Sequence, residues 1–250
     1  METVEVFFLD KSVRLLQPKT GFRTSFDSVM LSSACLVRSG QRVLDMGCGV
    51  GGASLCLLER VPDCHVSGID VQADYVDLAQ ENAKLNGRSA QADYFTGDIR
   101  EYDVDASDLR YDHIICNPPY MESGAHLISP DQGKAIASGH LEDDMDVSVW
   151  VKAALRLLKS GGSITFIHRA DMSAEILNAF GKSFGAVEII PLWPKAGVSS
   201  KRVIIRAVKD RKSPLSLHAG LIVHNDDGSY SDKAEQILRD AAFINDVLDL

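Results

Sequence analysis

The sequence RVLDMGCGVGG at residues 42–52 decides the fold, because a short apolar run ends there in a glycine-rich turn. Residues 53–60 follow with the apolar spacing of a helix, and residues 64–70 read as a second strand. Strand, glycine turn and helix in this order are typical of the first unit of a doubly wound α/β sheet. The glycines let the chain turn tightly and let a ligand approach its backbone closely.

The same alternation of strands and helices continues beyond this unit. It predicts helices at 72–86, 141–159 and 171–182, and strands at 92–95, 112–117, 163–168, 187–192 and 202–208. The last two strands have no helix between them, so the final strand is expected to return antiparallel. Such alternation places a parallel sheet between two layers of helices. The predicted fold class is therefore Rossmann-like α/β: a seven-stranded, mostly parallel sheet with a last antiparallel strand and helices on both faces.

The segments on either side of this region follow other patterns. Residues 4–16 predict a β hairpin, and residues 25–36 predict a helix. The tail, after Pro214, predicts a turn at 225–228 and a helix at 231–243. No linker separates two cores, so we expect one folded unit made of an N-terminal extension at 1–40, a central domain at 41–212 and a C-terminal appendage at 213–250 packed on that domain.

The composition is that of a globular protein, with 250 residues of which 45% are hydrophobic and 24% charged. It excludes a disordered tail, a collagen-like repeat and a coiled-coil rod. No apolar run reaches the roughly 18 residues that a membrane helix needs, and the first residues lack the pattern of a secretory signal. Five cysteines without a C-x-x-C pair favour buried thiols in a reducing compartment, so we expect a cytoplasmic protein.

Carboxylates near the ends of the first three strands narrow the choice of ligand. The turn satisfies G-x-G-x-x-G at residues 47–52, so a dinucleotide is one alternative. Asp45 suits the methionine ammonium of S-adenosylmethionine (SAM) and would repel the pyrophosphate of a dinucleotide. Asp70 ends the next strand, where it can hold ribose hydroxyls or cap the following helix. Asp98 follows the third strand and can accept a hydrogen bond from the adenine amine or simply belong to a turn.

SAM is therefore the predicted cofactor. Equilibrium binding of SAM against NAD separates it from the dinucleotide alternative. The predicted cofactor-binding residues lie in the glycine turn and at the ends of these strands: Asp45, Gly47, Cys48, Gly49, Gly51, Asp70, Val71, Asp98 and Ile99.

A second motif, Asn117-Pro118-Pro119-Tyr120, comes at the end of the fourth predicted strand. This is the edge at which open α/β sheets bind ligands, and the two prolines stiffen the turn so that its polar atoms are placed in advance. The Asn117 side-chain oxygen and the Pro118 carbonyl can each accept an N–H bond from an amino group conjugated to a ring. Tyr120 offers a face on which a base can stack. The four residues are the predicted catalytic residues; an ordinary Pro-Pro turn is the alternative.

VLDMGCGVGG, GID, GDI and NPPY together resemble the class I SAM-dependent methyltransferases that methylate nitrogen. Within that group the chain is similar to the bacterial valine-tRNA (adenine-N6) methyltransferase family, which modifies the adenine beside the anticodon. The resemblance extends to GFRTSFDSVMLSSA at 21–34, to His140 and to the tail at 221–238. It implies that residues 23–27 fold over the cofactor, which adds Arg23 and Asp27 to the cofactor-binding residues, whereas His140 is read as structural.

Charge is unevenly spread along the chain. The net charge of −9 argues against indiscriminate nucleic-acid binding. Residues 195–212 nevertheless hold seven basic residues and one acid. We expect this run to form an RNA-facing rim rather than only a solvated strand edge, with the RNA-binding residues Lys195, Lys201, Arg202 and Arg206. The seven histidines show no H-x-x-x-H or His/Cys cluster, so no metal site is expected.

These residues predict methyl transfer from SAM to N6 of an adenine in structured RNA, most simply tRNA, whose loop bases can leave their stack. A ribosomal RNA base and a release-factor glutamine are alternative acceptors. The glutamine enzymes carry a sizeable helical domain before this fold, whereas only residues 1–40 precede the first strand here. A SAM-binding module without turnover is the alternative from another class, and an intact Asn117-Pro118-Pro119-Tyr120 argues against it. The oligomeric state does not follow from the sequence.

Overall fold

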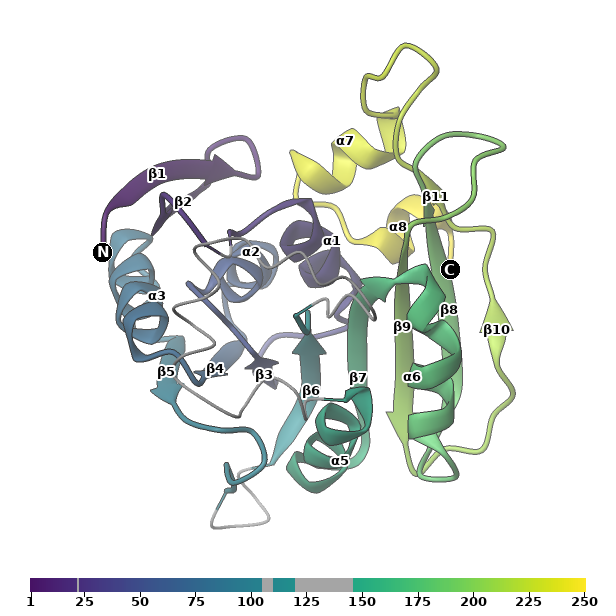
Figure 1. Ribbon diagram of the computed structural model, residues 1–250, viewed down its shortest axis with the longest axis horizontal. Helices are drawn as coiled ribbons and strands as arrows, with labels where there is room; N and C mark the ends of the chain where they lie inside the picture. Colours follow the sequence, from purple (N-terminus) through teal and green to yellow (C-terminus); the bar gives the residue numbers. More distant parts are fainter. Residues whose placement is uncertain (22, 105–109, 120–145) are drawn as a thin grey trace, which may run out of the picture.

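The computed structural model describes residues 1–21, 23–104, 110–119 and 146–250 (Figure 1). Its strands are β1 (Thr3–Phe8), β2 (Val13–Pro18), β3 (Arg42–Met46), β4 (His65–Asp70), β5 (Ala92–Thr96), β6 (Tyr111–Cys116), β7 (Leu158–Arg169), β8 (Phe184–Trp193), β9 (Arg202–Lys209), β10 (Ser216–Leu217) and β11 (Leu221–Ile222). Its helices are α1 (Phe26–Ala34), α2 (Gly52–Arg60), α3 (Ala73–Leu85), α5 (Val147–Leu157), the short 3-10 helix η2 (Ala170–Met172), α6 (Ser173–Phe180), α7 (Asp232–Leu238) and α8 (Ile244–Leu248).

Within the described residues, nine strands form the main sheet in the order β10-β8-β9-β7-β6-β3-β4-β5, with β11 also paired to β8. The strands from β7 to β5 in this order run parallel, whereas β9 is antiparallel to both β7 and β8. The seven predicted strands and the antiparallel last one are confirmed. The predicted count of seven strands is nevertheless too small, because the short strands β10 and β11 each pair with β8 and extend the sheet. Strands of two residues are too short to show an alternating apolar pattern.

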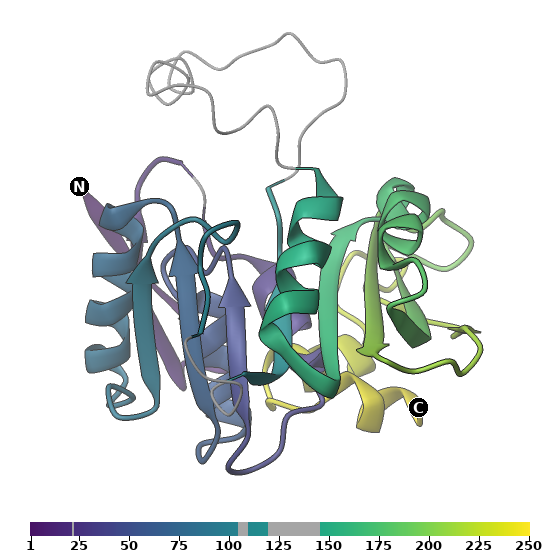
Figure 2. The same cartoon turned by 90° about the horizontal axis from the view of Figure 1, so that it is seen from below.

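Alternate residues of the central strands face two separate cores. Val43 of β3 belongs to a cluster with α1, α2 and α3, whereas its neighbour Leu44 belongs to a cluster with α5 and α6. The same split separates Ile115 from Ile114 in β6. Successive side chains of a strand point to opposite faces of a sheet. The predicted helices on both faces are thus confirmed, and Figure 2 shows the sheet from a second direction.

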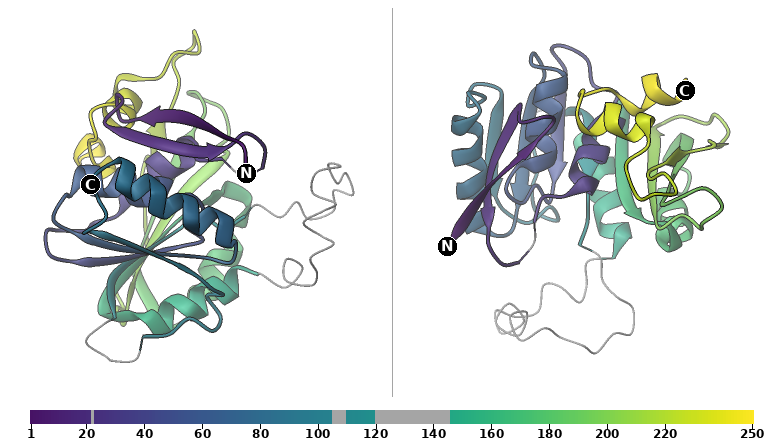
Figure 3. Two further views of the ribbon diagram at one scale, coloured as in Figure 1. Left: turned by 90° about the vertical axis from the view of Figure 1, so that its left-hand side faces the viewer. Right: turned by 90° about the horizontal axis from the view of Figure 1, so that it is seen from above.

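Both ends of the chain contribute to the first of these cores. Leu15 of β2, Leu221 of β11, Ile237 of α7 and Ile244 of α8 are buried in the same cluster as α1 and α2. The hairpin β1–β2 packs on α2 and α3, and α7 and α8 pack on α1 (Figure 3). The residues of the predicted parts 1–40, 41–212 and 213–250 therefore share one apolar cluster.

Two predicted helices differ from the observed ones. The single tail helix expected at 231–243 is wrong, because α7 ends at Leu238 and α8 begins at Ile244. Between them, Ala241 has a φ of +56°, which a continuous right-handed helix does not contain. The long helix expected at 141–159 is observed as α5, and β7 begins directly after it at Leu158. Its predicted start lies outside the described residues.

Candidate active site

The two motifs and Asp70 come together at one edge of the sheet. Met46, the last residue of β3, pairs with Ile69 of β4 on one side and with Cys116 of β6 on the other. The glycine turn, Asp70 and Asn117 begin or lie at the carboxyl ends of these three neighbouring strands. Ligands bind outside the carboxyl ends of the strands in open α/β sheets, so this edge is the candidate active site.

The glycine turn folds back over β4. The backbone N–H groups of Gly47 and Cys48 both donate to the Ile69 carbonyl, at 2.8 and 3.1 Å. Gly47, Gly49 and Gly51 have φ values of +70°, +53° and +83°, a region that favours glycine. A Cβ on Gly47 would also lie 3.0 Å from the indole ring of Trp150. Gly47 therefore lacks a side chain for steric as well as conformational reasons.

Cys48 presents only its backbone to this edge. Its side chain is buried in the first core, and burial raises the pKa of its thiol well above the usual value. The turn closes with a hydrogen bond from Gly51 N–H to the Cys48 carbonyl at 2.9 Å. Gly51 then serves as the N-cap residue of α2. The N-terminal end of α2 thus follows directly on the turn.

Asp70 anchors the turn and borders an exposed apolar side chain. Its carboxylate accepts hydrogen bonds from Gly49 N–H and from Gln72 N–H, each at 2.9 Å. Burial raises the pKa of this carboxyl, and the backbone hydrogen bonds oppose that shift. The next residue, Val71, is 54% exposed. A carboxylate with spare lone pairs beside an uncovered apolar side chain fits a ribose and the base attached to it. The sequence alternative is not observed, because Gln72 and not Asp70 is the N-cap residue of α3, and the side chain of Gln72 makes no capping hydrogen bond within the described part of the chain.

Asp45 lies beneath the turn rather than beside it. Its side chain is buried, and one carboxylate oxygen accepts a hydrogen bond from Ser54 Oγ of α2 at 2.6 Å. Burial raises the pKa of this carboxyl to about 6, although the bonds from Ser54 act in the opposite direction. The structure thus assigns Asp45 a partner within the protein. Direct contact with the ammonium of SAM stays a prediction.

Asp98 and Ile99 follow β5 at the same edge. Asp98 forms an ion pair with Arg100, whose Nε donates to the carboxylate at 2.8 Å, and this bond lowers the pKa of Asp98. The side chain of Ile99 is buried in the core beneath α5, and its carbonyl accepts from Arg156 at 2.8 Å. Their predicted contacts with the adenine of SAM are not tested by this arrangement.

Asn117 follows β6, which lies between β3 and β7 in the sheet. Asn117 is half-buried, Pro118 is buried and Pro119 is exposed. The motif therefore starts one strand away from the glycine turn. Tyr120, the last residue of the predicted catalytic motif, and His140 lie outside the described residues.

The segment that precedes α1 lies against the glycine turn, a contact that sequence reasoning missed. Thr24 is 7% exposed, and its side chain lies where a Cβ on Gly52 would be. Asp27, in the first turn of α1, forms an ion pair with Arg202, whose Nε lies 3.0 Å from Asp27 Oδ2. Arg23 is exposed. The resemblance had placed residues 23–27 over the cofactor, and the signal for the contact itself was the second glycine of the pair Gly51-Gly52, in a helix that does not require one.

The basic run at 195–212 does not form one rim. Lys195, Lys201 and Arg202 precede or begin β9, at the carboxyl edge of the parallel strands. Arg211 and Lys212 follow the eight-residue β9 at the opposite edge, about 25 Å away at 3.3 Å per residue. Of the first group, Lys201 is exposed, whereas Lys195 donates to the Asp226 carbonyl at 2.9 Å. Only this first group shares an edge with Asn117.

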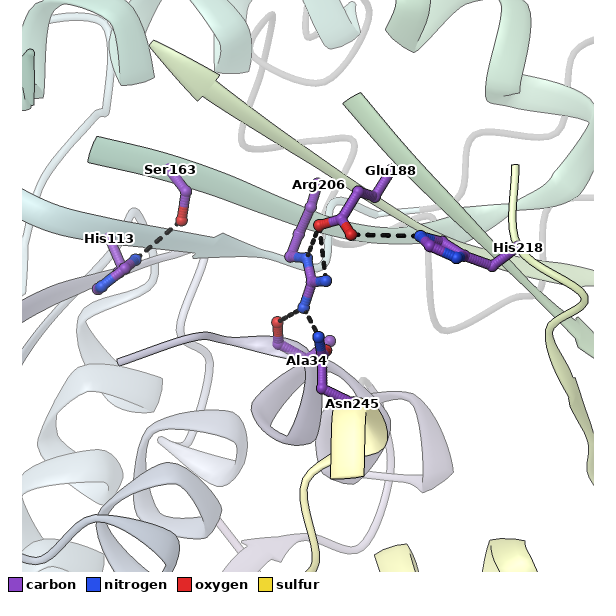
Figure 4. Close-up of polar contacts among 7 residues, drawn as sticks. All are labelled: Ala34, His113, Ser163, Glu188, Arg206, His218 and Asn245. Carbon is purple, nitrogen blue, oxygen red and sulfur yellow. Dashed lines mark hydrogen bonds and ion pairs between the residues drawn. The ribbon is translucent and has the colours of Figure 1, made fainter. Parts of the chain in front are cut away.

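The prediction that Arg206 binds RNA is wrong. Arg206 is 2% exposed, because its side chain points to the face of the sheet that α1 and α8 cover. Its guanidinium donates to Glu188 at 2.7 and 3.0 Å, to the Ala34 carbonyl at 2.9 Å and to Asn245 at 2.7 Å (Figure 4). Glu188 also lies 3.2 Å from a ring nitrogen of His218. Arg206 thus ties β8, α1 and α8 together inside the molecule.

The residues at the edge fit SAM. A glycine-rich turn over β4 whose Cys48 and Val50 side chains are buried, a carboxylate at Asp70 and the uncovered Val71 supply backbone donors, an acceptor for hydroxyls and an apolar surface. Within the described ranges, no three His, Cys, Asp or Glu side chains gather as a metal site would require. In the same residues, no helix has the length and apolar character needed to cross a membrane.

Comparisons with known proteins agree with this geometry. A family model for the methyltransferase small domain matches residues 25–132. The chain is 26% identical over 232 residues to a tRNA1(Val) (adenine(37)-N6)-methyltransferase of Aeromonas hydrophila, which covers 92% of this chain and 94% of that protein. It is 28% identical over 198 residues to a release factor glutamine methyltransferase of Chlorobaculum tepidum, which covers 76% of this chain and 66% of that protein.

A solved structure shares the fold. It is a predicted O-methyltransferase of Agrobacterium tumefaciens, with a TM-score of 0.68 and 23% identity, and the match covers 84% of this chain and 94% of that one. This fold agrees with the strand order, with the glycine turn over β4 and with the methyltransferase relatives named above. The chain has the fold of the class I methyltransferases, and its residues 25–132 match the family model for the methyltransferase small domain.

Proposed function

We propose that this enzyme methylates N6 of an adenine in tRNA. The observation that carries the proposal is the position of Asn117 at the end of β6, one strand from the glycine turn that ends β3. A turn with a side-chain amide and a backbone carbonyl suits a planar amino group with two N–H donors. The similarity to the Aeromonas hydrophila tRNA1(Val) (adenine(37)-N6)-methyltransferase over most of both chains supports adenine and tRNA as the acceptor.

Bound SAM supplies an electrophilic methyl group to this site. The lone pair of an exocyclic amine is delocalised into the ring, so the nitrogen is a weak nucleophile. The Asn117 side-chain oxygen and the Pro118 carbonyl each accept one N–H bond, which fixes the nitrogen and increases its electron density. The proton that remains after transfer is acidic and leaves to water, so no strong base is needed. Tyr120 completes the proposed set with a face on which the base stacks.

The basic residues at this edge support an RNA acceptor. Lys201, which is exposed, precedes β9, and Arg202 is its first residue; β9 pairs with β7, and β7 neighbours β6. With Lys195 they are the proposed contacts to the phosphates on either side of the flipped base. The tRNA substrate and five buried free thiols favour a cytoplasmic enzyme.

The test is transfer of a radiolabelled methyl group from SAM with the purified protein. Unmodified tRNA, ribosomal RNA and release-factor protein are offered in separate reactions, and the products are digested to nucleosides or amino acids. The proposal expects N6-methyladenosine from tRNA and none with Asn117→Ala. Label in ribosomal RNA alone would move the acceptor to another RNA.

A protein glutamine is the second candidate acceptor. The similarity to the Chlorobaculum tepidum release factor glutamine methyltransferase favours it, and a side-chain amide also offers a planar nitrogen with two N–H donors. Methylglutamine in the release-factor reaction, with no label in either RNA, would establish this activity and overturn the adenine proposal. The roles of Asn117 and Pro118 would then remain, with an amide in place of the base.

A further inference from the structure

Gly52 is a glycine whose own backbone does not require one. It opens α2 and does not have a positive φ. A Cβ at this position would lie 2.4 Å from both Cγ2 and Oγ1 of Thr24 and 3.0 Å from its Cβ. Thr24 is β-branched, buried and hence held in few rotamers. Because Gly52 has no side chain, the Thr24 side chain fills that space at the start of α2, directly after the glycine turn. We call this contact the seat of Thr24 on Gly52.

A second anchor lies three residues further along the chain. Asp27 is 8% exposed and forms an ion pair with Arg202 at the start of β9. The backbone of Arg202 is in register with Arg169 at the end of β7. The segment at residues 24–27 is therefore attached at one end to the turn that follows β3 and at the other to β9.

These anchors span the part of the edge that carries Asn117. The sheet order from the turn to Arg202 is β3, β6, β7, β9, which is three strand spacings or about 14 Å. Ser25 is extended, whereas Phe26 and Asp27 begin α1, so the backbone of residues 24–27 spans less than this and the side chains of Thr24, Asp27 and Arg202 supply the remaining reach. The segment thus crosses the interval in which β6 ends and Asn117 begins.

We infer that Thr24 and Asp27 are positioning residues for methyl transfer. With Thr24 seated on Gly52 and Asp27 bound to Arg202, the segment holds the cofactor side of the site in register with Asn117. Loss of either anchor frees the segment and weakens cofactor binding, although neither side chain needs to touch the reacting atoms. The inference concerns the methyl donor, so it does not depend on which acceptor the enzyme uses.

A double-mutant cycle on the first anchor tests the inference without turnover. Binding of S-adenosylhomocysteine is measured by calorimetry for Gly52→Ala, Thr24→Ala and the double variant. We expect Gly52→Ala to weaken binding about tenfold and Thr24→Ala about threefold, because the added methyl group clashes with Thr24. The double variant should bind within about twofold of Thr24→Ala, since the two contacts at 2.4 Å are gone and only the one with the Cβ of residue 24, at 3.0 Å, remains. If the double variant instead loses affinity by the product of the two single losses, the proposed contact between Thr24 and Gly52 is wrong.

The second anchor provides an independent test that carries the inference if Gly52→Ala does not fold. Asp27→Asn and Arg202→Met should each weaken S-adenosylhomocysteine about fivefold, and the double variant no further, because both remove one contact. Arg211→Met is the matched control, since Arg211 is exposed at the opposite edge. Hydrogen exchange should rise at residues 24–28 in the anchor variants and not in the control. Unchanged affinity with both anchor variants, or equal losses with the control, would overturn the inference.

Discussion

Arg202 Nε lies 3.0 Å from Asp27 Oδ2, and this ion pair joins two residues that the sequence assigned to different ligands. Asp27 was expected at the cofactor and Arg202 at RNA. Their side chains are 11% and 32% exposed, so the contact is largely withdrawn from solvent. The guanidinium of Arg202 already pairs with Asp27. Substitution of Arg202 therefore removes this contact with α1 as well as any contact with RNA. Lys201 is the cleaner probe of RNA at this edge.

Asn117→Ala is expected to separate cofactor binding from chemistry. Asn117 lies at the end of β6, whereas the glycine turn and Asp70 belong to β3 and β4. The variant should bind S-adenosylhomocysteine within about twofold of the parent and lose turnover by about a hundredfold or more, the scale of one lost oxyanion-type contact. Calorimetry and single-turnover methyl transfer measure the two effects. Equal losses in both would make Asn117 a structural residue.

Asp70→Ala is expected to weaken cofactor binding first, in contrast to Asn117→Ala. Its carboxylate braces the turn through Gly49 N–H and is the proposed acceptor for the ribose hydroxyls. Loss of charge-assisted bonds of this kind costs about 1.5–3 kcal/mol each, or ten- to a hundredfold in affinity for S-adenosylhomocysteine. Asp93→Ala is the control, since Asp93 is an exposed carboxylate of β5 that pairs with His65. Unchanged affinity in Asp70→Ala would remove this residue from the cofactor site.

The strands and helices around the glycine turn were predictable because their signals are local. The apolar run of β3, the three glycines with positive φ and the apolar spacing of α3 are each written in a few adjacent residues. The position of Asp70 and Asn117 at one edge then follows from parallel pairing alone. Local pattern and sheet topology together give the outline of the site.

The remaining features depend on contacts between distant residues. RVIIRAV reads as an amphipathic edge strand, but α1 and α8 cover the face to which Arg206 points and bury it. Which distant helices cover the face of a strand is not encoded in the sequence of that strand. The seat of Thr24 on Gly52 likewise joins positions 28 residues apart, and the only local trace is a second glycine at the start of α2.

Arg206→Met is expected to reduce stability rather than RNA binding. It removes the partner of Glu188 and leaves the Ala34 carbonyl and Asn245 without their donor (Figure 4). Breaking a buried ion pair from one side costs about 3–5 kcal/mol. Urea unfolding should show a loss of this order, against less than about 0.5 kcal/mol for the exposed Arg211→Met. An intact stability with weakened RNA binding would restore the sequence-based assignment.

Lys201→Ala and Lys212→Ala are a matched pair for the RNA-facing edge. Both lysines are exposed, but they lie at opposite ends of β9. If Lys201 contacts a phosphate, its removal should lower the slope of log K against log salt for tRNA binding by about 0.7–0.9, whereas Lys212→Ala leaves the slope unchanged. Filter binding at several salt concentrations gives both slopes. Equal slopes in the two variants would place the RNA elsewhere.

Asp45 is expected to make stability depend on pH in an unusual direction. Burial raises the pKa of its carboxyl from 3.8 to about 6, so the folded protein holds this proton more tightly than the unfolded chain does. The contribution of Asp45 to stability therefore falls as pH rises from about 4 to about 6 and is level above that. Two units correspond to about 3 kcal/mol. Asp45→Asn is neutral throughout and should escape this loss.

Urea unfolding of both proteins between pH 4.5 and 7.5 measures the difference directly. Asp45→Asn should gain stability relative to the parent as pH rises to about 6, and a difference that stays constant with pH would contradict the raised pKa. Calorimetry then tests the role predicted for Asp45 in the cofactor site. An ammonium group beside this carboxylate favours its charged form, so S-adenosylhomocysteine binding near pH 6 should release a fraction of a proton. Heats measured in buffers of different ionisation enthalpy would reveal that release, and it should vanish in Asp45→Asn. Binding without proton release in the parent would confine Asp45 to its bond with Ser54 beneath the turn.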